Sequence, residues 1–128
     1  MNCTKVVRFT NETDVMPHIH VLVKQVPDTN AKIVIGSDRV DLSAVKMVMS
    51  PYDEFAVETA LRHKEASGGE VTALTVGGPA ADKILKDAKA IGVDNIVRVD
   101  NAEPLDSNGL QTVLSHAVQA LGAEVVYC

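Results

Sequence analysis

The chain has 128 residues, of which 46% are hydrophobic and 23% are charged, the balance of one compact domain with its own core. A formal net charge of -5, without a run of Lys or Arg, argues against a nucleic-acid partner. The longest apolar stretches are far shorter than the roughly 20 residues of a membrane-spanning helix. Residues 1–17 lack the apolar centre of a secretory signal. We therefore expect a cytosolic protein with no membrane insertion, and a disordered extension over residues 1–17.

Aromatic residues make up only 3% of the chain and Trp is absent, so the core must consist of Val, Ile, Leu and Ala. This mixture is typical of parallel sheets that are buried on both faces. Cys3 and Cys128 lie at opposite ends of the chain, with no other metal-binding residue at a suitable spacing. We interpret them as free thiols.

The first strand is predicted over residues 19–26, where β-branched residues are concentrated. Alternating residues in 32–35 and 39–42, around a turn, predict a small hairpin that lies over the domain. Ser50 followed by a proline predicts the start of a helix over 51–66, with the serine hydroxyl as its N-cap. The predicted inner face of this helix consists of Phe55, Ala56, Thr59, Ala60 and His63.

Three further strands and two further helices are predicted in the second half of the chain. The strands cover residues 70–76, 95–99 and 124–128. One helix covers residues 80–91 and ends at Gly92, and the other begins at Asp106 or Ser107 and ends at Gly122. The expected inner residues of these two helices are Ile84, Leu85, Ala88, Ile91, Leu110, Val113, Leu114, Ala117, Val118 and Leu121.

Strands and helices alternate along the whole chain, which predicts right-handed crossovers and a parallel sheet. The fold class is therefore α/β, a doubly wound parallel sheet in a three-layer α/β/α arrangement. In such folds ligands bind beyond the carboxyl ends of the strands, where the strand order reverses. The loops that follow Gln25, Val76, Val99 and Cys128 are the places to look for a site.

The sequence has no GxGxxG motif after the first strand and contains no GxxxxGK[ST], GxSxG or HExxH pattern. His18 and His20 would lie on one side of a strand and could share a metal, although two polar residues at a strand entrance are the simpler interpretation. Asp53 with Glu54 could form an acid/base pair, but acids at a helix start ordinarily serve the helix dipole. What remains is a group of loop residues with backbone suited to a ligand: Lys24, Ser50, Pro51, Gly77 and Gly78.

Three segments together resemble the beta subunit of electron transfer flavoproteins, including the FixA-like group. They are VLVKQVPDT at 21–29, VKMVMSPYDEFAVETALRHKE at 45–65, and GEVTALTVGGPAADKILKDAKAIGVDNIVRV at 69–99. The resemblance covers residues 19–128 and implies a Rossmann-like adenine-nucleotide-binding domain of the HUP type. It departs from the family at Ser50, where asparagine is usual.

The resemblance implies a heterodimer with an FAD-bearing alpha subunit, in which the beta subunit binds AMP or a second FAD. Electrons would pass from acyl-CoA or other flavin dehydrogenases to an acceptor, so the chain would be an electron carrier and not an enzyme, with the redox chemistry supplied by the flavin. Carried over from the family, the nucleotide-binding residues would be Leu22, Val23, Lys24, Ser50, Pro51, Tyr52, Asp53 and Gly77.

Members of that family continue for about as long again, so residues 18–128 would be its N-terminal half, truncated after the fourth main strand. An alternative is a stand-alone adenine-nucleotide-binding module of the stress-protein type, which would bind AMP or ATP without a partner. An independent enzyme of this fold, such as a pyrophosphatase relative, is a third possibility, but no nucleophile, base or metal cluster supports it.

Overall fold

The computed structural model describes residues 16–101 and 103–128. Cys3 and most of the predicted disordered extension therefore lie outside the described residues. The described part begins beside the sheet, where the Pro17 carbonyl accepts a hydrogen bond of 3.2 Å from the N–H of Glu70.

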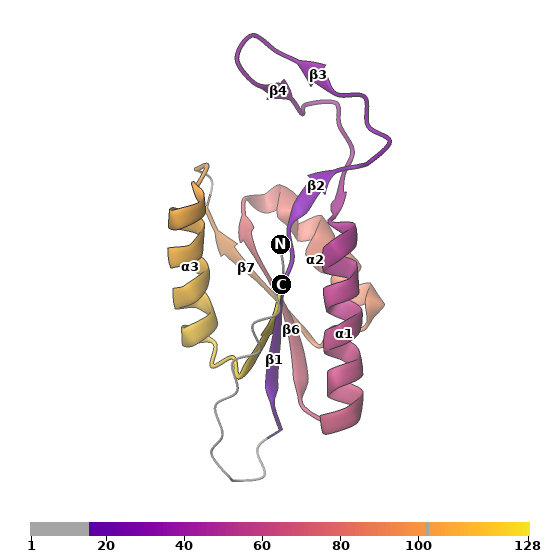
Figure 1. Ribbon diagram of the computed structural model, residues 1–128, viewed down its shortest axis with the longest axis vertical. Helices are drawn as coiled ribbons and strands as arrows, with labels where there is room; N and C mark the ends of the chain where they lie inside the picture. Colours follow the sequence, from indigo (N-terminus) through magenta and orange to yellow (C-terminus); the bar gives the residue numbers. More distant parts are fainter. Residues whose placement is uncertain (1–15, 102) are drawn as a thin grey trace.

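Four parallel strands form the central sheet in the order β7–β6–β1–β8 (Figure 1). Their bounds are β1 His18–Leu22, β6 Glu70–Gly77, β7 Asn95–Asp100 and β8 Val125–Tyr127. The chain passes from β1 through β6 to β7 and then returns to the other side of β1 as β8. This confirms the doubly wound parallel sheet and places the reversal of strand order between β1 and β8.

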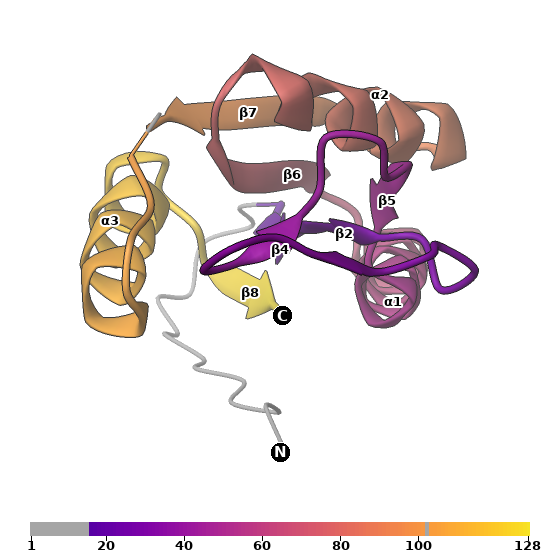
Figure 2. The ribbon, with the colours of Figure 1, turned by 90° about the horizontal axis from the view of Figure 1, so that it is seen from above.

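Helices cover both faces of the sheet, which gives the predicted three layers. Figure 2 shows α1 (Pro51–Ser67) and α2 (Asp82–Ile91) on one side and α3 (Ser107–Ala120) on the other. A short 3-10 helix, η1 (Pro79–Ala81), leads into α2. Asp106 caps α3, because its carboxylate accepts a hydrogen bond of 2.7 Å from the N–H of Gly109. Gly92 and Gly122 end their helices at positive φ, as predicted.

The main core lies between the sheet and the pair α1 and α2. Its buried members are Ile19, Val21, Val23, Met49, Val57, Ala60, Val71, Ala73, Ile84, Leu85, Ala88, Val93 and Val125. The predicted inner face of α1 is confirmed for Ala60, which is buried, and for Ala56, which packs against the core. It was wrong for Phe55, which is 72% exposed, and it omitted the buried Val57. Ile91 was also misplaced, since it is 46% exposed at the last turn of α2. The predicted inner residues of α3 are not closely packed on the sheet, because none of the residues of this helix is buried.

The predicted first strand is broken in two. β1 ends at Leu22, and β2 (Gln25–Pro27) pairs antiparallel with β5 (Met47–Met49) in a separate ribbon. Local bonds at Lys24 explain the break: its N–H donates to the Asp53 carboxylate at 2.8 Å and its carbonyl accepts the Ser50 N–H at 3.1 Å. Both main-chain groups are therefore bound to the start of α1, and the chain leaves the sheet after Val23.

The small hairpin is present as β3 (Val34–Ile35) and β4 (Val40–Asp41). It projects beyond the carboxyl ends of the strands and does not lie over the domain (Figure 1), so this part of the prediction was wrong. Both of its strands are exposed. The prediction that the Ser50 hydroxyl caps α1 was also wrong, because this hydroxyl makes no capping bond. The Ser50 carbonyl instead accepts the first helical N–H groups of α1.

Candidate functional site

A pocket of about 320 Å³ lies at the carboxyl ends of the strands, between the sheet and α3. It occupies the position where the strand order reverses, which is the position that ligands take in doubly wound folds. Its lining is formed by Leu22, Val23, Lys24, Asp53, Leu74, Thr75, Val76, Leu110, Leu114 and Cys128. Aliphatic side chains from β1 and β6 thus face two leucines of α3 across a slot that is mostly apolar.

Four of the residues predicted for a site come together in this pocket: Leu22, Val23, Lys24 and Asp53. Val23 closes the ladder between β1 and β6, since its N–H donates to the Leu74 carbonyl at 2.9 Å. Beyond this bond the chain turns away toward α1, and the Asp53 carboxylate holds the Lys24 N–H. The pocket opens where β1 leaves the sheet.

The other predicted residues at the start of α1 are not among the lining residues of the pocket. Ser50 is 4% exposed and bonded to Lys24, so it supports the pocket without lining it. Pro51 is exposed, and the Tyr52 side chain is 84% exposed. Of the residues predicted at this helix start, only Asp53 lines the pocket.

Gly77 lies at the same sheet edge but its backbone is directed to the other neighbour of β6. Its carbonyl accepts hydrogen bonds from the Arg98 guanidinium at 3.1 Å and from the Asn101 N–H at 3.3 Å. It lines a smaller hollow of about 250 Å³ beside the main pocket. With two donors on this oxygen, Gly77 has little capacity left to accept a bond from a ligand.

The backbone N–H and C=O that face the pocket are those of Val76. In a strand, successive residues present their N–H and C=O groups to opposite neighbours. Because Gly77 faces β7, Val76 faces the side of β1, where the ladder ends with the bond to Leu74. Within residues 16–101 and 103–128, no backbone bond continues that ladder to Val76.

Sequence reasoning missed Val76 and the α3 leucines as lining residues. The unbroken apolar run 19–26 hid the point at which β1 ends, and therefore hid the free edge of β6. Leu110 and Leu114 were predicted as core residues of the third helix. They line the pocket because α3 is not packed closely onto this end of the sheet.

Asp53 is the titratable carboxylate of the pocket. Burial raises its pKa above the ordinary value, and this outweighs the opposing effects of the Lys24 N–H and the Lys24 charge. The side chain is therefore held where its charged form is only partly compensated. A ligand with a hydrogen-bond donor near this carboxylate would find a basic acceptor.

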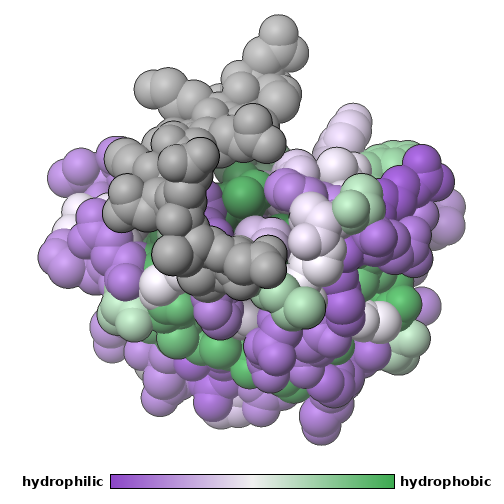
Figure 3. Space-filling model, turned by 90° about the horizontal axis from the view of Figure 1, so that it is seen from below, coloured by the Kyte–Doolittle hydropathy of each residue, from purple (hydrophilic) through white to green (hydrophobic). Residues whose placement is uncertain are grey.

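The two histidines considered for a metal lie at the opposite, amino end of the sheet. Hydrophilic residues cover most of that face of the molecule, with hydrophobic ones visible between them (Figure 3). His20 is 2% exposed, its Nδ1 has no partner, and burial, with a smaller effect of His18, lowers its pKa. Among the residues that the structure describes, no group of three His, Cys, Asp or Glu side chains could hold a metal ion.

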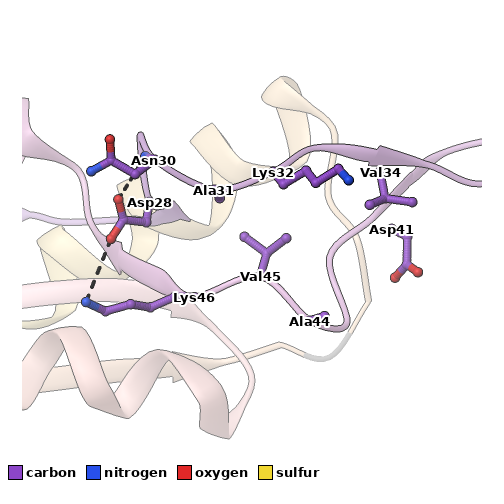
Figure 4. Close-up of a pocket in the computed structure, with 9 residues that line it drawn as sticks. All are labelled: Asp28, Asn30, Ala31, Lys32, Val34, Asp41, Ala44, Val45 and Lys46. Carbon is purple, nitrogen blue, oxygen red and sulfur yellow. Dashed lines mark hydrogen bonds and ion pairs between the residues drawn. The ribbon is translucent and has the colours of Figure 1, made fainter.

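A further hollow of about 450 Å³ lies at the base of the hairpin, and Val34 and Val45 are among its lining residues (Figure 4). The Asp28 carboxylate accepts the Asn30 N–H at 3.0 Å and pairs with the Lys46 ammonium at 3.7 Å. These polar groups are bonded to one another, so we interpret their role in this hollow as structural.

No helix in the described part of the chain is long and apolar enough to cross a membrane.

The family model of the electron transfer flavoprotein domain matches residues 39–128, which includes α1, β6 and the α3 wall of the pocket. The chain belongs to the electron transfer flavoprotein family. This confirms the resemblance inferred from the three sequence segments.

Three relatives show how far the similarity extends. The electron transfer flavoprotein subunit beta of Bacillus subtilis is 38% identical over 102 residues, 77% of this chain and 40% of that protein. The acryloyl-CoA reductase electron transfer subunit gamma of Anaerotignum propionicum is 34% identical over 116 residues, 86% of this chain and 43% of that protein. Protein FixA of Sinorhizobium fredii is 35% identical over 108 residues, 82% of this chain and 38% of that protein. The electron transfer flavoprotein domain described here thus spans about two fifths of these relatives.

Proposed function

We propose that this chain forms one wall of an adenine-nucleotide site in an electron carrier of the beta-subunit type. The ligand would be AMP or a second FAD. An alpha subunit that carries FAD would complete the site, and acyl-CoA or other flavin dehydrogenases would deliver electrons to the complex. A bound flavin supplies the redox chemistry, and the chain contributes binding and orientation.

The observation that carries the proposal is the free edge of Val76 beside an aliphatic slot. The slot between Leu22 and Leu114 offers apolar surface to both faces of a flat ring. Adenine presents a donor, its amino group, next to an acceptor, its ring N1. A backbone carbonyl and N–H that face the same way are the matching pair.

Nucleotide selectivity tests this proposal without any mutation. We expect AMP to bind at least about tenfold more tightly than IMP, because hypoxanthine exchanges donor and acceptor on the edge that adenine presents and leaves the backbone groups unpaired. Titration calorimetry of the chain, alone and with an alpha subunit of the family, measures both affinities. Equal binding of AMP and IMP would contradict the assignment of the pocket.

A second measurement separates the electron carrier from the stand-alone nucleotide module. If the chain is a carrier subunit, size-exclusion chromatography with an alpha subunit yields a complex that absorbs as a flavin. A stand-alone module would bind AMP or ATP at full affinity without a partner and would not co-elute. Failure of both co-elution and nucleotide binding would overturn the proposed function.

A further inference from the structure

Arg98 joins three parts of the chain beside the pocket. It lies on β7, with its side chain 24% exposed, and its Nη1 donates to the Gly77 carbonyl at 3.1 Å. The same nitrogen donates to the Asp100 carboxylate at 2.5 Å, and Nε lies 2.7 Å from the carboxylate of Asp82 at the start of α2, an ion pair in which Nε makes no hydrogen bond. The guanidinium can divide its contacts in this way, because its charge is delocalised over three nitrogens.

The peptide that Arg98 holds lies in a stretch of two consecutive glycines. β6 ends at Gly77 and Gly78 follows, and neither glycine adopts a positive φ. A Cβ atom at Gly78 would meet nothing within 4 Å, so close packing does not explain this residue. Two adjacent glycines increase the backbone freedom of the turn, and contacts from outside must order it.

We propose that Arg98 is a positioning residue for the nucleotide site. It fixes the Gly77 carbonyl toward β7, and strand geometry then directs the N–H and C=O of the preceding residue, Val76, into the pocket. The Asp100 carboxylate accepts a hydrogen bond from the guanidinium, and the Asp82 carboxylate pairs with its charge. This inference rests on the proposed function, since it concerns the same site.

The amino end of β6 is held in a comparable way and provides a matched control. There the Asp94 carboxylate accepts the Val71 N–H at 2.8 Å and pairs with the Lys64 ammonium at 2.5 Å. This second contact involves the same strand and a similar number of bonds, but it lies at the opposite end of the sheet from the pocket. Its loss should lower stability without affecting the nucleotide.

The experiment compares Arg98→Leu, Arg98→Lys and the control Lys64→Met in the complete chain, with the alpha subunit where the complex forms. Titration calorimetry measures AMP affinity, urea unfolding measures stability, and NMR measures amide hydrogen exchange. The Asn101 amide is the local reporter, because it donates to the same Gly77 carbonyl. The Val71 amide reports on the control end.

We expect Arg98→Leu to weaken AMP binding about tenfold and to accelerate exchange at Asn101, with little change at Val71. Arg98→Lys should restore part of the affinity, since an ammonium keeps the charge but cannot form the divided contacts. Lys64→Met should accelerate exchange at Val71 and leave AMP affinity unchanged. These contrasting effects distinguish positioning from a general loss of stability.

Two results would overturn the inference: unchanged exchange at Asn101 in Arg98→Leu, or equal losses of AMP affinity in Arg98→Leu and Lys64→Met. If the unmodified chain binds AMP in neither format, the proposed function fails, and the exchange at Asn101 still decides whether Arg98 orders the end of β6. Because Arg98→Lys retains a cation at the site, it also provides the comparison if Arg98→Leu does not fold.

Discussion

The main-chain N–H of Lys24 donates a 2.8 Å hydrogen bond to the carboxylate of Asp53. This bond joins the end of β1 to the first turn of α1 across 29 positions in the sequence. It draws the chain out of the sheet, so that β6 continues beyond β1 with a free edge. The residues that resemble a nucleotide-binding motif thus have a structural role as well, since they create the opening that the pocket occupies.

The pH dependence of stability should reveal the partly compensated charge of Asp53. Its pKa in the folded chain is raised above the ordinary 3.8, so the folded state retains this proton to higher pH than the unfolded state. The free energy of unfolding should therefore fall as pH rises through the interval between the two pKa values. Asp53→Asn, which stays neutral, should remove this contribution, and urea unfolding at several pH values measures it.

Asp41→Asn is the control with the opposite sign. The pKa of the exposed Asp41 is lowered by its hydrogen bonds with Ser43, first through the side chain and then through the backbone. Its contribution should be lost as pH falls through that lowered pKa, so the wild type should gain stability relative to this variant as pH rises. The same slope in both variants would contradict the assignment of Asp53.

Asp94→Asn should destabilise the chain at neutral pH by about 1–3 kcal/mol, because the part-buried carboxylate bonds both Val71 N–H and Lys64. Burial is the largest single influence on the pKa of Asp94 and raises it. The hydrogen bonds from Lys64 and Val71, together with the charge of Lys89, outweigh burial, so the pKa is lowered overall. This stabilisation is present above pH 3.8 and should disappear as pH falls through the lowered pKa.

The exposed pair of Arg62 and Glu58 on α1 is the comparison for Asp94. Their side chains are 76% and 53% exposed, so Glu58→Gln should change the free energy of unfolding by no more than about 0.5 kcal/mol. Thermal and urea unfolding of both variants at pH 7 and pH 3 measure the difference. A loss from Glu58→Gln as large as that from Asp94→Asn would refute the distinction.

Gly69→Ala should be among the most damaging small substitutions in the chain. Gly69 has a φ of +99°, and an added Cβ would lie 2.1 Å from the Pro17 carbonyl oxygen, so the loop before β6 must move. Gly122→Ala is the matched control, because φ is +68° there but nothing lies within 4 Å of the new atom. It should cost only about 1–2 kcal/mol, the strain of a left-handed residue. The urea midpoint of Gly69→Ala should be clearly lower than that of Gly122→Ala.

Aliphatic residues on one face of the hairpin should drive self-association. Pairing of Ile35 with Val40 places Ile33, Ile35, Val40 and Leu42 on the same face, and each is at least 43% exposed. Ile35→Lys, at the position that is 81% exposed, should reduce association in sedimentation velocity and leave stability within about 0.5 kcal/mol. Lys32→Ile, on the other face, should not reduce it.

The sequence predicts the order of strands and helices well, because the spacing of apolar residues and the residues at helix ends depend only on neighbouring positions. Pro51 after Ser50 marks the start of α1, and Gly92 and Gly122 mark the helix ends that were expected. The alternation of the elements then determines the parallel sheet, since few connections can join them. Leu22, Val23, Lys24 and Asp53 were located together through a family resemblance and not through periodicity.

The remaining errors arise from contacts between distant residues. Apolar composition alone extends the first strand through Val26, but the bonds of Lys24 with Asp53 and Ser50 end it at Leu22. Phe55 is the largest apolar residue at the start of α1, yet it is exposed, and the smaller Val57 is buried against the sheet. The same kind of one-residue error explains why Gly77 was predicted to bind the ligand in place of Val76. Neighbouring residues in a strand present their backbone groups to opposite sides.

Filling the slot under α3 tests the pocket most directly. Leu114→Trp places a large ring among Leu22, Leu74 and Val76, where a ligand ring would lie, and should reduce AMP affinity more than about tenfold. Stability should change little, because Leu114 is only partly buried. Gln111→Trp introduces the same ring at an exposed position of α3 and should leave AMP affinity unchanged. If titration calorimetry shows full affinity in Leu114→Trp, the nucleotide lies elsewhere on the chain.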